Sequence, residues 1–210
     1  RYLLKNSIDL MTEQNTKSVL GLRLPTDPRW VNLAEKQIED ILTDHAYCEQ
    51  KAATSCISLI VQYPDKMKLV ERVSPIVTEE WGHFRMVLQE LKKRGLHLGK
   101  QRKDEYVNQL LKSIRKGVGD KQLLDKLLIC ALIEARSCER FKRLNEGLTE
   151  KELKDFYYAL MVSEAGHYKL FIELAEEYFD KDEVRNRWDE MLKLEGKIMA
   201  SIDARGDRIH

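Results

Sequence analysis

The chain has 210 residues, of which 34% are charged, with a net charge of +1 and only four prolines. This length suits one domain with a sizeable core, and the balanced charge excludes a strongly basic nucleic-acid binder. The longest apolar run, residues 127–133, is far shorter than the roughly 20 residues that span a bilayer, so we expect no membrane segment. None of the four cysteines forms a Cys-x-x-Cys pair, which favours reduced, buried thiols and a cytoplasmic protein.

Apolar residues recur at helical spacing along most of the chain and predict an all-α fold. Residues 1–29 are expected to be irregular, and prolines and glycines mark the ends of the segments that follow. Pro75 is expected to kink or break the second helix. The helices are predicted over residues 30–63, 65–94, 104–116, 120–145, 150–179 and 182–203.

Two Glu-x-x-His motifs stand on predicted helices. Glu80 and His83 form the first, and Glu164 and His167 form the second, 84 residues later. Residues three apart share a helix face, so each motif can direct a carboxylate and an imidazole at one point. The exact repeat indicates two related halves.

Each motif has a partner glutamate on the preceding helix. Glu49 and Glu80 lie 14 and 15 residues from their common turn, so at ~1.5 Å per residue they are level. Glu134 and Glu164 lie 11 and 15 residues from theirs, about one helical turn apart in height. Glu139 would be mismatched by roughly 13 Å, so we expect it at the surface or as an outer partner of a ligand.

Four carboxylates and two imidazoles suit two adjacent irons, with manganese as an alternative. A single Glu-x-x-His motif usually lies on a solvated face, but two such motifs, each with a level partner, favour a metal site. The predicted ligands are Glu49, Glu80, His83, Glu134, Glu164 and His167.

Four further residues are placed beside these ligands by helical spacing. His45 lies one turn before Glu49, and Cys138 one turn after the glutamate of the third long helix. Phe84 and Tyr168 each follow a motif glutamate by four residues. They are candidates for outer partners or pocket walls, and core packing explains each of them at least as well.

The basic residues are concentrated in one segment. Residues 92–121 contain ten Lys or Arg against three acids, a net charge of +7. This segment includes the long connection between the two helix pairs and could hold RNA phosphates, although a solvated loop explains the charge equally well. The candidate contacts are Lys92, Lys93, Arg94, Lys100, Arg102 and Lys103.

The strings DHAYCEQKAA, EEWGHF, LIEARSCERF and SEAGHY resemble the bacterial tRNA 2-methylthio-isopentenyl-adenosine hydroxylase family, within the ferritin-like di-iron superfamily. The resemblance covers roughly residues 20–203. Length and charge distribution predict one domain over 1–210 with a basic crossover at 95–119. The resemblance implies a ferritin-like four-helix bundle of two antiparallel pairs with accessory helices. It also implies a di-iron centre on the same six residues and dioxygen as co-substrate. The expected reaction is hydroxylation of the isopentenyl group of a hypermodified adenosine in tRNA.

The sequence contains no Gly-rich nucleotide fingerprint and no cysteine cluster for an iron–sulfur centre. We therefore expect a separate electron donor, a ferredoxin or a reductase, and a monomer or dimer. One alternative is a ferritin-like or rubrerythrin-like protein that handles iron or peroxide, although the Cys-x-x-Cys pairs of a rubrerythrin are absent. Another is a non-enzymatic, helical RNA-binding or scaffold protein.

Overall fold

The structure is a computed structural model that describes residues 19–117, 119–202 and 205–210. Across these residues all regular structure is helical, and no strand occurs. None of the helices in this part of the chain is both long and apolar enough to cross a membrane. The predicted all-α class is confirmed.

The chain divides into two compact units. One contains Pro28–Glu105 together with Ala204–His210, and the other contains Tyr106–Asp203 together with the N-terminal residues up to Asp27. Each is built around one pair of long antiparallel helices.

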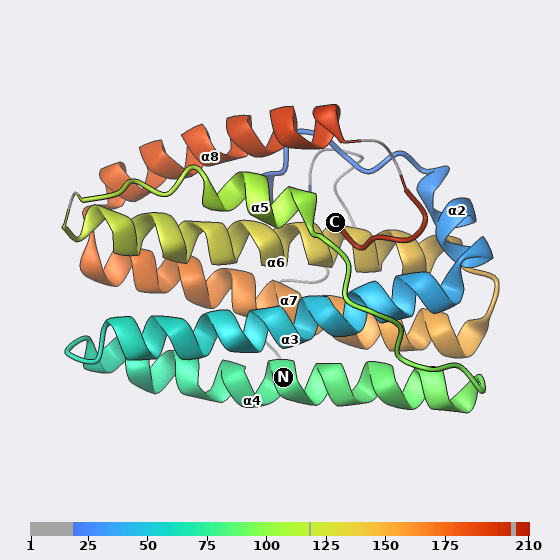
Figure 1. Cartoon of the computed structure of the whole chain (residues 1–210). Coiled ribbons are helices and arrows are strands. Elements are labelled where there is room, and N and C mark those ends of the chain that lie inside the picture. Colours follow the sequence, from blue (N-terminus) through green and yellow to red (C-terminus); the bar gives the residue numbers. More distant parts are fainter. Residues whose placement is uncertain (1–18, 118, 203–204) are drawn as a thin grey trace, which may run out of the picture. The chain divides into compact units, whose positions relative to one another are not determined.

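In the first unit, α3 (Ile38–Gln62) and α4 (Met67–Lys93) form the antiparallel pair, joined by a tight turn (Figure 1). A short helix, α2 (Trp30–Lys36), precedes α3. The single helix predicted over 30–63 is therefore wrong at Gln37, whose φ of −126° and ψ of 41° are not helical. The chain changes direction there because one non-helical residue interrupts the ladder of hydrogen bonds.

Helix α4 continues through Pro75, so the predicted kink does not divide it into two helices. At its C-terminal end, Gly95 has a φ of +68°. Its N–H donates to Lys92 O (3.0 Å), and the N–H of Leu96 donates to Leu91 O (2.9 Å). This is a Schellman cap, which needs a left-handed residue, and glycine adopts that conformation without strain.

The second unit contains the pair α6 (Lys121–Gly147) and α7 (Lys151–Tyr178), with α8 (Lys181–Ser201) packed against both (Figure 1). A 3₁₀ turn, Val19–Gly21, contacts α6, and the short helix α5 (Glu105–Leu111) begins at the boundary between the units. The predicted helix 104–116 is thus shorter than expected. Helix α6 is buried along most of its length and forms the centre of this unit.

The C-terminal segment 205–210 returns to the first unit and is held there by specific contacts. The indole N–H of Trp30 donates to Arg205 O (2.8 Å). Gly206 lies so close to the backbone of Leu33 that a Cβ atom would overlap it. Only glycine can therefore occupy position 206 without moving α2.

Further along, Arg102 donates from Nη2 to Asp207 O (2.7 Å) and from Nη1 to Asp207 Oδ2 (3.1 Å). The backbone N–H of Ile209 donates to Asp44 Oδ2 on α3 (2.8 Å). Ile209 and His210 are buried at the end of this segment. The segment is thus an ordered strap along the first unit, which the sequence periodicity did not predict.

Candidate metal centre

The first half of the predicted ligand set lies between α3 and α4. Glu49 on α3 and Glu80 and His83 on α4 are all buried, with exposed fractions of 4%, 0% and 9%. His83 Nδ1 lies 3.5 Å from Glu49 Oε2 and 3.6 Å from Glu80 Oε2. One ligand atom from each of the three residues lies within 4.8 Å of the others. We call these residues the α3–α4 triad.

His45 supports this triad from one turn earlier on α3. Its side chain is fully buried, and its Nε2 donates to Glu49 Oε1 over 2.6 Å. A carboxylate only accepts, so this contact fixes both the orientation of Glu49 and a proton on His45 Nε2. The structure thus places His45 as an outer partner of a candidate ligand, a position that matches one of the two predictions made for it.

The second half of the set lies between α6 and α7. Glu134 on α6 and Glu164 and His167 on α7 are buried, with exposed fractions of 5%, 2% and 4%. His167 Nδ1 lies 3.4 Å from Glu164 Oε2, almost the spacing of the corresponding pair on α4. One ligand atom of each residue again lies within 4.8 Å of the others. We call these residues the α6–α7 triad.

The chemistry of each triad fits a divalent metal. Two carboxylates and one imidazole are donors that suit iron and manganese. Buried carboxylates packed this closely repel one another and resist ionisation unless a cation is present. Each unit therefore carries a buried carboxylate–histidine group that can hold a metal.

Glu139, rejected as a ligand because of its height, has another role. It is buried with an exposed fraction of 2%, so the first of its two predicted positions, at the surface or as an outer partner of a ligand, is wrong. It accepts from Arg136 Nη1 (3.1 Å), Arg143 Nε (3.2 Å) and Thr26 N (3.1 Å). Arg136 also donates from Nε to Glu195 on α8 (2.8 Å). Glu139 is thus a structural carboxylate that ties the N-terminal segment to α6.

The two aromatic candidates pack against tryptophans within their own units. The ring centroids of Phe84 and Trp81 are 4.8 Å apart, and those of Tyr168 and Trp188 are 5.9 Å apart. Burial raises the pKa of the Tyr168 hydroxyl, so this group is a neutral phenol at neutral pH. These contacts favour packing roles for both residues.

Cys138 is buried on α6, and its thiol donates to Met161 O on α7 (3.5 Å). Burial, and then the charge of Glu164, raise the pKa of this thiol to about 12. Cys138 therefore stays protonated near the α6–α7 triad. Its small, neutral side chain lies buried between α6 and α7.

The six candidate tRNA contacts differ in how they are engaged. Lys92 and Lys100 are exposed. Lys93 is exposed but lies 2.7 Å from Glu90 Oε1, and Arg94 pairs with the same carboxylate. Arg94 therefore neutralises a buried glutamate of α4 rather than facing solvent as a free charge.

Arg102 is also committed within the unit, since it pairs with Asp40 (2.9 Å) as well as with Asp207 of the strap. Lys103 pairs with Glu105 (2.7 Å) but keeps an exposed side chain. Two of the six predicted contacts, Arg94 and Arg102, thus form ion pairs with carboxylates of their own unit. The lysines are the cations that remain accessible.

Comparison with known proteins identifies the relatives of this chain. The sequence model of one protein family, described as tRNA-(MS[2]IO[6]A)-hydroxylase (MiaE), matches residues 13–210. A relative from Pseudomonas putida, named tRNA 2-(methylsulfanyl)-N(6)-isopentenyladenosine(37) hydroxylase, is 36% identical over 182 residues, which cover 87% of this chain and 88% of the relative. A protein of the same name from Salmonella typhimurium is 29% identical over 210 residues and 77% of each chain.

Among solved structures, this chain is similar to one described as protein 43 with aldehyde deformylating oxygenase activity from Synechococcus. The TM-score is 0.85 at 34% identity, covering 90% of this chain and 94% of the other. This similarity confirms the predicted ferritin-like fold class. The chain belongs to the MiaE family of tRNA hydroxylases.

Proposed function

We propose that this protein is an oxygen-dependent di-iron monooxygenase that hydroxylates the isopentenyl group of a hypermodified adenosine in tRNA. Membership of the family supports the reaction class. The observation that supports a metal cofactor is the pair of buried triads, each with two carboxylates and one imidazole. We expect the reaction to take place in the cytoplasm.

In this proposal the residues of the triads hold two iron ions, with manganese as the alternative metal. The equal donor sets and the 84-residue repeat of the motifs support this arrangement. Bound iron would supply the activation of dioxygen, the co-substrate. The residues of the chain hold the metal, and His45 keeps Glu49 in one orientation through the 2.6 Å hydrogen bond.

The burial of both triads supports a further role for the protein, the exclusion of bulk water from the metal. With each ligand residue at most 9% exposed, a reactive centre is shielded from side reactions in solvent. The electrons must come from a separate ferredoxin or reductase, and we propose that the protein acts as a monomer or dimer. The protein's role is therefore to position the metals and the alkyl group rather than to store electrons.

The direct test is mass spectrometry of tRNA nucleosides after incubation of the iron-loaded protein with isopentenylated tRNA, a chemical reductant and air. We expect the substrate nucleoside to gain one oxygen atom, and the gain to require both iron and oxygen. An unchanged nucleoside profile with fully iron-loaded protein would contradict the proposal. Iron uptake without hydroxylation would favour a ferritin-like or rubrerythrin-like role instead.

A second candidate function comes from the solved neighbour, whose description names aldehyde deformylating oxygenase activity at 34% identity. It is tested in the same reaction with a fatty aldehyde in place of tRNA, by measuring release of the formyl carbon. We expect turnover of tRNA to exceed that of the aldehyde. The reverse preference would assign this chain to aldehyde chemistry despite its family.

The site of tRNA binding is proposed to include the accessible lysines of residues 92–103. Reversing the charge of Lys92 and Lys100 should weaken tRNA binding and flatten the slope of log affinity against log salt by about one unit per lost phosphate contact. A matched control reverses Lys181 and Lys197 of α8, which are also exposed and change the net charge equally. Equal salt dependence in both variants would place the RNA elsewhere.

A further inference from the structure

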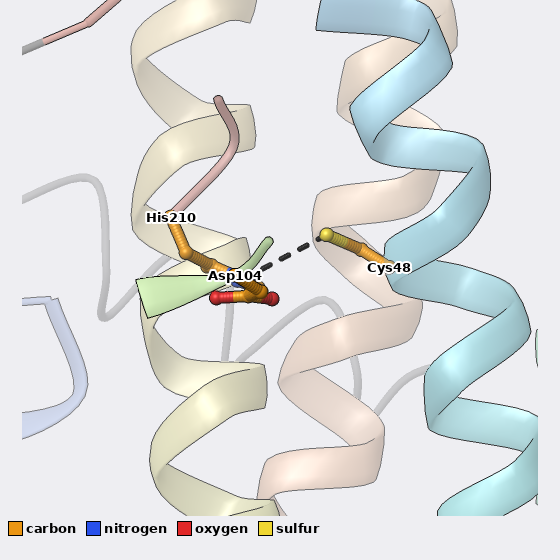
Figure 2. Close-up of side chains that lie close together, drawn as sticks. All are labelled: Cys48, Asp104 and His210. Carbon is orange, nitrogen blue, oxygen red and sulfur yellow. Dashed lines mark hydrogen bonds between the residues drawn. The ribbon is translucent and has the colours of Figure 1, made fainter. Parts of the chain in front are cut away.

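A third group of metal-binding residue types lies in the first unit, separate from the triads. Cys48 on α3, Asp104 just before α5, and His210 at the end of the C-terminal strap approach one another (Figure 2). One ligand atom of each lies within 4.8 Å of the others, and Cys48 Sγ is 3.8 Å from His210 Nδ1. Cys48 precedes Glu49 in sequence, but successive side chains on a helix project about 100° apart.

This donor set differs from that of the triads because it contains sulfur. A thiolate, an imidazole and a carboxylate are ligands that Zn²⁺ takes, with a fourth position for water. With Zn–S of about 2.3 Å and Zn–N of about 2.0–2.1 Å, a tetrahedral site places sulfur and nitrogen about 3.5 Å apart. The observed 3.8 Å needs only a small side-chain rotation to reach that distance.

The surroundings of Cys48 collect negative charge. Asp44, one turn earlier on α3, lies with its Oδ2 3.9 Å from Cys48 Sγ, and the same oxygen accepts the N–H of Ile209. A divalent cation would offset this charge and replace the thiol proton, which passes to solvent.

Two cations of the chain already pair with carboxylates around the site, and one of them is Arg208, whose Nη1 lies 3.7 Å from Asp44 Oδ1. Lys51, one turn after Cys48 on α3, forms an ion pair with Asp104. The side chain of Asp104 is 12% exposed and that of Lys51 is 28% exposed, so the ammonium can withdraw toward solvent. Metal binding would then exchange a Lys51–Asp104 pair for a metal–carboxylate bond.

We propose that one divalent cation, with Zn²⁺ as the preferred metal, is bound by Cys48, Asp104 and His210. This metal would link the C-terminal strap to α3 and to the segment before α5. Cys48 and His210 are 162 positions apart in the sequence, so the metal would close a long loop. A link that closes a long loop lowers the entropy of the unfolded chain and thereby stabilises the folded one. The site is structural, and the hydroxylation chemistry does not use it.

The test is titration of the iron-loaded protein, with all 210 residues present, with Co²⁺ under anaerobic conditions and a thiol-free reductant. A cysteine ligand gives a sulfur-to-cobalt charge-transfer band, whereas the carboxylate and histidine ligands of the triads give none. We expect a band that saturates at about one Co²⁺ per chain and disappears when Zn²⁺ is added. The variants Cys48→Ser and His210→Ala should each weaken binding by at least about tenfold.

The matched control is Cys130→Ser, since Cys130 is also a half-buried cysteine on a long helix, and it should keep the band. Lys51→Met should strengthen binding by removing the competing ammonium. If Cys48→Ser folds poorly, the band of the His210→Ala variant still tests the proposal, because this substitution lies in the strap and not in a long helix. Absence of the band in the parent, or its persistence in both Cys48→Ser and His210→Ala, would overturn the proposal and leave a hydrogen-bonded anchor without metal.

Discussion

The α3–α4 and α6–α7 pairs carry the same donors in nearly the same geometry, but they are supported differently. The Glu-to-His distances are 3.6 Å on α4 and 3.4 Å on α7. In the first unit, a histidine one turn before the glutamate of α3 holds that glutamate directly. In the second unit, the position one turn before Glu134 is Cys130. Arg136 of α6 pairs with Glu139 on the same helix and with Glu195 on α8. The donors are thus duplicated, whereas the residue one turn before the glutamate is a histidine in one unit and a cysteine in the other.

The largest expected effect comes from removing one glutamate of either triad. Glu134→Ala and Glu49→Ala should each lower iron content by at least one metal per chain. Each should also reduce tRNA hydroxylation by more than about 100-fold, because lost ligands cost more than the 10- to 100-fold typical of outer partners. Metal analysis and nucleoside mass spectrometry measure the two effects. A variant that kept both irons would show that its triad lies outside the metal centre.

A stability difference between the units is expected at the position five residues after each of these glutamates. Glu139→Ala removes one of the two carboxylates that pair with the buried Arg136, leaving Glu195 as the other, and should cost about 1–3 kcal/mol, or about 2–12 °C in melting temperature. The corresponding residue of α3 is Thr54, which is exposed, so Thr54→Ala should be nearly neutral. Calorimetry of both variants makes the comparison, and iron content should stay unchanged in each. Equal melting temperatures would contradict a structural role for Glu139.

A smaller effect is expected one turn before each ligand glutamate. His45→Ala removes the hydrogen bond to Glu49 and should weaken iron binding by about 10- to 100-fold while the protein stays folded. Cys130→Ala, at the matching position of α6, should leave iron affinity unchanged. Competition with a chelator measures both affinities. Similar losses in the two variants would mean that the two halves are supported alike after all.

The smallest expected effect is a decrease of the free energy of unfolding at acid pH, caused by carboxylates of the second unit. Burial opposes ionisation of Glu139, but Arg136 and the hydrogen bonds from Thr26 outweigh it and lower the pKa of this carboxyl. Asp125 is likewise buried, and Arg115 and Arg187 lower its pKa. A lowered pKa contributes stability above the unfolded-state value, and this contribution is lost as the pH falls through the folded-state value.

Urea unfolding at several pH values below neutral tests this expectation. The parent should lose stability below the ordinary glutamate pKa of 4.5. Glu139→Gln should be less stable at neutral pH but should lose less on acidification. If the two pH profiles were parallel, the Glu139 ion pairs would not contribute to acid sensitivity.

Much of the candidate site could be predicted from local sequence spacing. Glu80 and His83, and likewise Glu164 and His167, share a helix face because they are three residues apart, whatever surrounds the helix. Counting residues from each turn then singled out Glu49 and Glu134, since an α-helix rises by a constant ~1.5 Å per residue. The structure groups each of these glutamates with the motif on its neighbouring helix. The helical class followed from the same periodicity.

Contacts between distant segments were decided only by the tertiary structure. Gln37 breaks the first helix although nothing in the residue itself requires it. Arg102 belongs to a basic cluster in the sequence, yet in the fold it binds Asp207, 105 positions away. The burial of Glu139 depends in the same way on Thr26, 113 positions away. Helical periodicity reports which face of an element is apolar, but it carries no information about which remote polar group will meet a given charge, because that is fixed only when the whole chain packs.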